Sequence, residues 1–179
     1  MNESSIAVTA VDPGDDGAVL RRLLVEFHEW MHEQAAAHDV AAYDVAAELA
    51  EDVESLAGEP DSWAWVARAG GEPAGCILLY GETDDLAECR RLWVRPDHRR
   101  RGVGRALTRR VAEAARAQGY ETLGLTTPPW SEAAQTLYDS LGFERTPPYP
   151  ETRLPERYHD EAIFMQLDLA RGGGGATDG

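Results

Sequence analysis

Lysine is absent from this sequence, since all 17 cationic residues of the 179-residue chain are arginine. A P-loop nucleotide-binding site, a protein kinase and a pyridoxal-phosphate enzyme each depend on a lysine side chain, so these three classes are excluded. Cysteine is also scarce, because the chain has only Cys76 and Cys89, both in apolar stretches. This arrangement excludes a disulfide framework and a Cys-x-x-Cys metal site.

Long hydrophobic runs are absent as well. No apolar run approaches the roughly 20 residues that a membrane-spanning helix needs. Residues 1–5, Met-Asn-Glu-Ser-Ser, lack the charged and apolar regions of a signal peptide. We therefore expect a cytoplasmic protein without a membrane partner. The length of 179 residues favours one domain, which can bury roughly 70% of the surface of its unfolded chain without a metal or disulfide.

Positive charge is scarce overall but concentrated in one window. The 17 arginines face 32 acidic residues, which gives a net charge of −15. A field of this sign argues against nucleic-acid binding. Between positions 90 and 110, however, nine arginines face the single Asp97, so this window carries +8 and the other 158 residues carry −23. The nine are Arg90, Arg91, Arg95, Arg99, Arg100, Arg101, Arg105, Arg109 and Arg110. Because arginine binds phosphate oxygens bidentately, the window indicates an anion site, with a solvated basic helix face as the alternative.

Hydrophobic spacing and turn residues predict an α/β fold with one strand–helix–strand unit at its centre. Strands are expected over residues 6–11, 62–69, 73–80, 87–95, 121–127 and 162–169, with an extended stretch after Phe143. Helices are expected around the apolar stripes Leu20-Leu23-Leu24-Phe27-Met31, Ala46-Leu49-Val53-Leu56 and Val103-Leu107-Val111-Ala114, and between Ser131, as N-cap, and Gly142. The domain is expected to cover residues 1–169, and the glycine-rich tail, residues 170–179, is expected to be disordered.

Two glycines stand between a predicted strand and a predicted helix, in Arg99-Arg100-Arg101-Gly102-Val103-Gly104. Glycines let the backbone approach a ligand closely, and a helix N-terminus contributes roughly 0.3–1 kcal/mol toward an exposed anion. The segment therefore predicts a cradle for a pyrophosphate. The dinucleotide-binding fingerprint does not fit, because Leu107 replaces its third glycine. NAD binding is not expected.

Residues 92–107, LWVRPDHRRRGVGRAL, closely resemble the acetyl-CoA-binding motif of the GNAT superfamily of N-acetyltransferases. The family pattern [Gln/Arg]-x-x-Gly-x-[Gly/Ala] is met by Arg99, Gly102 and Gly104. A second block matches the family's A-x-x-L-Y-x-x-L-G-F through Ala134, Leu137, Tyr138, Leu141, Gly142 and Phe143. The resemblance implies a GNAT-like mixed, mostly antiparallel central sheet, with a V-shaped splay between two strands and flanking helices.

The same resemblance implies an N-acetyltransferase that moves acetyl from acetyl-CoA to a primary amine by direct attack in a ternary complex. The implied cofactor-binding residues are Leu92, Trp93, Val94, Arg99, Arg100, Arg101, Gly102, Val103, Gly104, Arg105 and Ser131, the last where the family often has asparagine. Tyr138 matches the acid that protonates the CoA thiolate, and Glu88 matches a glutamate that serves as base in many relatives. The alternative for Tyr138 is a core tyrosine without a catalytic role. The alternative for Glu88 is a surface carboxylate paired with Arg90, in which case a chain of water molecules would serve as the base. No metal is expected.

The segment His28-Glu29-Trp30-Met31-His32 matches the HExxH zinc motif on a predicted helix. Both histidines would share one side of that helix, and Glu51 or Asp52 lies near the spacing of a third ligand. A zinc-dependent hydrolase is therefore the competing enzyme class. Against zinc, flanking positions are charged or polar where metalloproteases usually carry uncharged or apolar residues. We favour two histidines that border the acceptor cleft, because the resemblance implies that the first helices shape this cleft. A noncatalytic acyl-CoA sensor is the third hypothesis.

The acceptor amine is expected to lie between residues 27–43 and 147–160, which mix aromatic side chains with carboxylates. Such a lining suits a cationic or aromatic amine, on a small molecule or a peptide, and composition does not choose between them. The family resemblance leaves a homodimer open. The many carboxylates without lysine are typical of proteins from a salt-rich cytoplasm, which predicts lower stability in low salt than in molar salt.

Overall fold

The computed structural model describes residues 5–12, 16–40 and 43–170. The strands are β1 (Ile6–Ala10), β2 (Ser62–Ala69), β3 (Glu72–Gly81), β4 (Leu86–Val94), β5 (Thr122–Thr127), β6 (Glu144–Thr146) and β7 (Ile163–Asp168). The helices are α1 (Gly17–Ala37), α2 (Val45–Gly58), α3 (Val103–Gln118) and α4 (Glu132–Ser140), with short 3-10 turns η1 (Pro96–His98) and η2 (Glu156–Tyr158). Each predicted helix and strand is present at its predicted place. From residue 171 on, the predicted tail lies outside the described residues.

In the described part of the chain, seven strands are hydrogen-bonded in the order β1-β2-β3-β4-β5-β7-β6. β4 and β5 are parallel, whereas β1 with β2, β5 with β7 and β6 with β7 are antiparallel. This confirms the predicted mixed, mostly antiparallel sheet. The chain divides into two compact units, unit 1 with residues 1–78 and 91–107, and unit 2 with residues 79–90 and 108–179.

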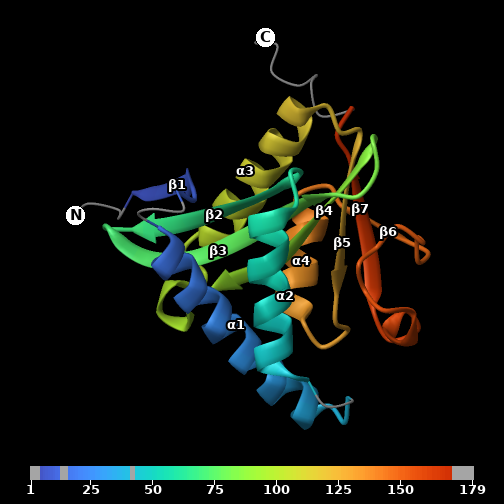
Figure 1. The fold of residues 1–179 in the computed structure, drawn as a ribbon, viewed down its shortest axis with the longest axis horizontal. Coiled ribbons are helices and arrows are strands. Elements are labelled where there is room, and N and C mark those ends of the chain that lie inside the picture. The colour runs from blue at the N-terminus through green and yellow to red at the C-terminus, as the bar shows by residue number, and fades with distance from the viewer. Residues whose placement is uncertain (1–4, 13–15, 41–42, 171–179) are drawn as a thin grey trace. The chain divides into compact units, whose positions relative to one another are not determined.

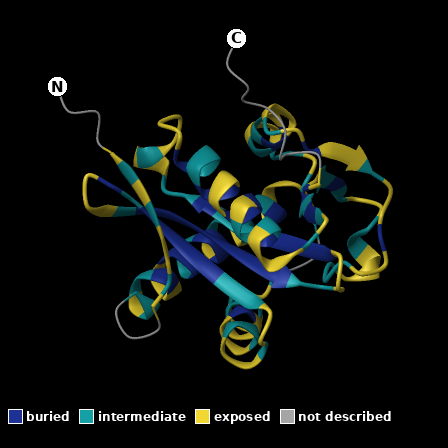
Figure 2. Ribbon diagram, turned by 90° about the horizontal axis from the view of Figure 1, so that it is seen from above, coloured by how far each residue is buried: buried dark blue, intermediate teal, exposed yellow. Residues whose placement is uncertain are grey.

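In unit 1, α1 and α2 lie side by side and both contact β2 (Figure 1). α1 buries the predicted residues Leu20, Leu23, Leu24 and Phe27. Burial of apolar side chains of this size stabilises by roughly 1.5–3 kcal/mol each, so this stripe holds α1 in place. Figure 2 shows the buried residues concentrated along the strands, in keeping with the apolar run Ala74–Tyr80 of β3.

The buried face of α2 is the predicted one only in part, since Leu49 and Leu56 are half-buried as expected. Its fully buried residue is Asp52, whereas Ala46 is exposed and Val53 has 38% of its surface exposed. The reason is electrostatic, since the Asp52 carboxylate is bonded to Arg91 and His28 in the core of unit 1. A paired, hydrogen-bonded charge is tolerated inside a protein, so Asp52 can occupy a buried position on this helix.

In unit 2, β7 lies between β5 and β6 (Figure 1). β5 pairs with β7 along its whole length, from Thr122 with Asp168 to Thr127 with Ile163. The parallel register of β4 with β5 covers only Leu86–Glu88 and Thr122–Gly124 in the described residues. Such a short parallel register is what the predicted splay requires. Ser131 is the N-cap residue of α4, as predicted, but its side chain makes no capping hydrogen bond.

Within the described residues, no helix combines the length and the apolar character needed to cross a bilayer.

Candidate functional site

The loop that precedes α3 in unit 1 has two residues with left-handed backbone. Arg100 has a φ of 58° and Gly102 has a φ of 86°. The left-handed region costs a residue with a Cβ atom roughly 1–2 kcal/mol, whereas glycine adopts it freely. The loop leads directly into α3, whose 16 residues begin at Val103, and Arg99, Arg100 and Arg101 are exposed. Three exposed arginines therefore directly precede a helix N-terminus, which is an arrangement that suits a phosphate or pyrophosphate.

Two arginines of the predicted anion window are committed elsewhere. Arg95 forms a two-pronged ion pair with Glu26, with Nε and Nη2 at 2.9 and 2.6 Å from the carboxylate oxygens. This hydrogen bond and the charge of Arg95 hold the pKa of Glu26 below its usual value, although burial opposes them. Arg91 pairs with Asp52 and Glu48. Because these carboxylates lie outside the window, its effective charge is smaller than the sequence count of +8.

The predicted pantetheine-binding strand segment, Leu92–Val94, is anchored on both sides. The Trp93 side chain is buried, and its Nε1 donates to Glu26 at 3.2 Å. Arg99 stacks its guanidinium 5.1 Å from the Trp93 ring centre and donates from Nε to the Val94 carbonyl at 3.0 Å. Just before this segment, Arg91 has a φ of 58°, which interrupts the regular strand. The backbone of residues 92–94 is therefore held by side chains as well as by the sheet.

Gly75 of β3 allows the closest backbone contact in this region. A Cβ atom added at Gly75 would overlap the carbonyl oxygen of Trp93. We expect Gly75→Ala to lower the free energy of unfolding by about 1–3 kcal/mol, because the Trp93 carbonyl must move. Denaturant unfolding measures the change. Gly58→Ala is the control, since nothing lies within 4 Å of a Cβ added there, and equal losses in both variants would contradict the steric argument.

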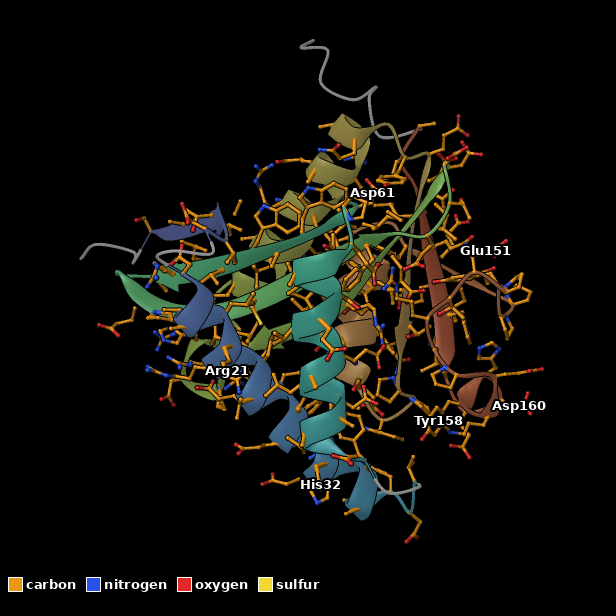
Figure 3. The ribbon with its side chains drawn as sticks, in the orientation of Figure 1. Arg21, His32, Asp61, Glu151, Tyr158 and Asp160 are labelled. Carbon is orange, nitrogen blue, oxygen red and sulfur yellow. The ribbon has the colours of Figure 1, made fainter. Side chains whose placement is uncertain are left out.

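The histidines of the HExxH motif have protein partners. His28 is fully buried, with Nε2 at 2.7 Å from Asp52 and Nδ1 at 2.6 Å from the Tyr43 hydroxyl. His32, exposed and labelled in Figure 3, places Nδ1 at 2.9 Å from the Tyr43 carbonyl. His28 is therefore a hydrogen-bonded residue in the interior of unit 1 rather than a surface histidine. With both ring nitrogens bonded to protein, His28 has none left for a metal, which counts against the zinc-hydrolase alternative. In the described residues there is no group of three or more metal-ligating side chains.

Tyr138 lies in the core of unit 2. Its ring centre is 5.6 Å from that of Phe143, and 6% of its surface is exposed. Burial, together with the nearby Cys89, raises the pKa of the Tyr138 phenol above its usual value. The phenol therefore keeps its proton throughout the neutral range and can act only as a donor to an anion. This geometry is compatible with both predicted roles, the acid and the core tyrosine.

Glu88 is buried in unit 2, with none of its surface exposed. The alternative of a surface carboxylate paired with Arg90 is therefore wrong. Tyr149, from the segment between β6 and β7, donates its hydroxyl proton to Glu88 Oε2 at 2.8 Å.

Ser131, the predicted replacement for the family asparagine, is half-buried, and its carbonyl accepts the Gln135 N–H at 3.1 Å.

The contacts of four residues in these surroundings do not follow from the sequence. Arg91 and Asp52 form an ion pair, although the sequence suggests an anion site for the first and a zinc ligand for the second. Tyr149, predicted only as part of the acceptor lining, bonds to Glu88, and Gly124 lies against Tyr149. Their partners lie far along the chain, 39 positions for Asp52 with Arg91 and 61 for Glu88 with Tyr149. Helical or strand periodicity carries no information at such separations. Gly124 had one usable signal, since glycine inside a strand often marks a close approach.

A sequence model of the acetyltransferase (GNAT) family matches residues 20–143. The chain is 35% identical over 116 residues to N-acetylaspartate synthetase of Xenopus tropicalis, covering 63% of this chain and 43% of that relative. The chain thus spans less than half the length of this curated relative. Among solved structures, its fold is similar to that of an acetyltransferase from Streptococcus agalactiae, with a TM-score of 0.70, 17% identity and coverage of 91% and 98%. It is also similar to a GNAT family acetyltransferase from Elizabethkingia anophelis with acetyl-CoA bound, with a TM-score of 0.64, 20% identity and coverage of 91% and 97%.

Proposed function

Because the chain belongs to the acetyltransferase (GNAT) family, we propose that it transfers an acetyl group from acetyl-CoA to the amino group of a small-molecule or peptide acceptor. The observation that carries this proposal is the loop before α3, where left-handed Arg100 and Gly102 and the exposed arginines at 99–101 directly precede a helix N-terminus. A chain without lysine and with a net charge of −15 has few other places for a pyrophosphate.

The residues that would hold the cosubstrate are those of the family motif. Backbone N–H groups from Arg100 to Arg105 would bind the pyrophosphate, and the backbone of Leu92 and Val94 would bind the pantetheine arm. The anchoring of residues 92–94 by Trp93 and Arg99 supports this assignment, because a preorganised backbone loses little entropy on binding. When bound, acetyl-CoA supplies the activated acyl group.

The reaction needs two proton transfers. The acceptor ammonium must lose a proton before it can attack, and the thiolate that leaves must gain one. Glu88 is the proposed base and Tyr138 the proposed acid, and these roles follow from the family motifs. Burial raises the pKa of the Tyr138 phenol, so the phenol carries the proton that the second role requires.

The proposed activity is tested by acetyl-CoA-dependent release of free thiol with a panel of cationic and aromatic amines. Release that depends on one class of amine is the expected result. Binding of CoA without release on any amine would favour the noncatalytic sensor. Stoichiometric zinc in protein purified without a histidine tag, with hydrolytic activity, would favour the zinc hydrolase.

The arginine loop gives a binding prediction. We expect the double variant Arg100→Gln/Arg101→Gln to bind CoA about five- to tenfold more weakly, a loss of about 1 kcal/mol, because two exposed charges near the pyrophosphate are removed. Isothermal titration calorimetry measures the change. S-acetyl-pantetheine, which lacks the pyrophosphate, is the matched control ligand, and an equal loss for both ligands would contradict a pyrophosphate role for the loop.

A further inference from the structure

Only one of the two carboxylate oxygens of the buried Glu88 has a hydrogen-bond partner among the described residues. Its Oε2 accepts the Tyr149 hydroxyl proton at 2.8 Å, but its Oε1 is buried and has no hydrogen-bond partner among the described residues. Leaving a buried acceptor unpaired costs free energy, and the cost is larger for a charged group. A buried oxygen without a hydrogen-bond partner gains free energy when a donor binds it. Glu88 Oε1 can therefore accept a hydrogen bond from an incoming N–H group.

Tyr149 is held by packing contacts around its ring and its hydroxyl. Its ring packs in a cluster with Leu86 and Phe164, edge to face with Phe164 at 5.4 Å between ring centres. On the other side, Gly124 leaves the space that the hydroxyl occupies, since a Cβ atom there would lie 2.5 Å from Tyr149 Oη. The hydroxyl is therefore held between Gly124 and Glu88 Oε2.

The segment that carries Tyr149 has its own anchor. Arg153 pairs with Glu82 and stacks over the Tyr80 ring, with its Cζ 4.3 Å from the ring centre. Figure 3 shows this segment between β6 and β7, marked by Glu151, Tyr158 and Asp160. Burial, and then the charge of Glu88, raise the pKa of Tyr149, so its phenol stays protonated and only donates.

We propose that Tyr149 is a positioning residue, whose O–H holds Glu88 Oε2 so that Oε1 is directed to the acceptor amine. In this arrangement Oε1 accepts an N–H of the acceptor ammonium and then takes its proton, which leaves a neutral amine and a protonated Glu88. The proton later passes to solvent and restores the carboxylate. This inference rests on the proposed acetyl transfer and specifies its acceptor side.

The first test is Tyr149→Phe, which keeps the ring and removes the O–H. We expect kcat to fall about tenfold, because the hydrogen bond from Tyr149 to the charged Glu88, the proposed base, is lost. KM for acetyl-CoA should stay unchanged, because the substitution does not touch the residues proposed to bind the cosubstrate. Tyr120→Phe, in the same unit ahead of β5, is the control for removal of a phenol O–H. Circular dichroism and CoA titration verify that each variant is folded.

The second test is a double-variant cycle with Glu88→Gln. If Tyr149 acts through Glu88, adding Tyr149→Phe to Glu88→Gln produces no further loss of kcat, whereas independent losses would overturn the inference.

Should Tyr149→Phe fail to fold, Gly124→Ala displaces the hydroxyl while keeping the ring, and the same kcat loss is expected. An active wild type with unchanged Tyr149→Phe kinetics overturns this inference alone. Absence of thiol release in the wild type overturns the proposed function and this inference together.

Discussion

Replacing Asp52 with asparagine is expected to lower the free energy of unfolding by about 3–5 kcal/mol, the cost of removing one partner of a buried ion pair. Asp52 is 2% exposed, and its two carboxylate oxygens share the single Nε–H of Arg91 in a bifurcated hydrogen bond, at 3.0 and 2.9 Å. Its Oδ2 also lies 2.7 Å from His28 Nε2. Asparagine has nearly the same shape, so the loss reflects charge rather than volume. The Arg91 guanidinium would stay buried with only Glu48 to balance it.

The matched control for Asp52→Asn is Glu48→Gln, which removes the other carboxylate paired with Arg91. The Glu48 side chain is 33% exposed, and ion pairs with a partner near the surface contribute only about 0–1 kcal/mol. Urea unfolding of the three proteins measures both effects. Equal, small losses in the two variants would mean that Asp52 is not the balancing charge for Arg91.

The Asp52 contribution also predicts a dependence on pH. Burial by itself would raise the pKa of Asp52, but the hydrogen bond with His28 and the charge of Arg91 outweigh it and hold the pKa below its usual value. A carboxylate with a depressed pKa stabilises the fold above its unfolded pKa of about 3.9, and this contribution is lost as the pH falls through the folded pKa. The stability difference between the wild type and Asp52→Asn should therefore be full near pH 7 and shrink below about pH 4.

Local patterns were enough to predict most of the fold. β2 has the predicted bounds, Ser62–Ala69, because a strongly apolar run ends at two glycines. Those glycines, Gly70 and Gly71, have φ values of 61° and 87°, as the predicted two-residue hairpin requires. Strand and turn signals of this kind depend on neighbouring residues, which the sequence shows directly.

Local sequence patterns did not predict ion pairs between residues that are far apart in the sequence. Counting arginines treated Arg91 and Arg95 as part of an anion site, but their partners Asp52 and Glu26 lie 39 and 69 positions away. In α2 the apolar stripe predicts the buried face, but Val53 is exposed and the buried side chain is Asp52. Its partners Arg91 and His28 lie on other elements, which helical periodicity does not reveal. Glu88 was left open between base and surface carboxylate, and the burial that decides against the surface depends on packing that periodicity does not encode.

Removing the hydroxyl of Tyr138 is expected to have the largest effect on turnover. In Tyr138→Phe, kcat should fall about 100-fold, the lower range for loss of a general acid, because the thiolate then leaves without a proton donor. CoA affinity should change little, since the phenyl ring keeps its contact with Phe143 at 5.6 Å between ring centres. Steady-state thiol release gives kcat, and calorimetry gives the affinity.

The two predicted roles of Tyr138 give opposite results in this experiment. A core tyrosine contributes through its ring, so phenylalanine would leave kcat intact and shift stability by less than about 1 kcal/mol. A general acid contributes through its O–H, so phenylalanine would lower kcat while stability stays the same. Because burial raises the pKa of the phenol, the wild type should also keep its rate up to at least about pH 10, with no alkaline loss from Tyr138 below that pH. Unchanged turnover in Tyr138→Phe would remove Tyr138 from the mechanism and leave solvent as the proton source for the thiolate.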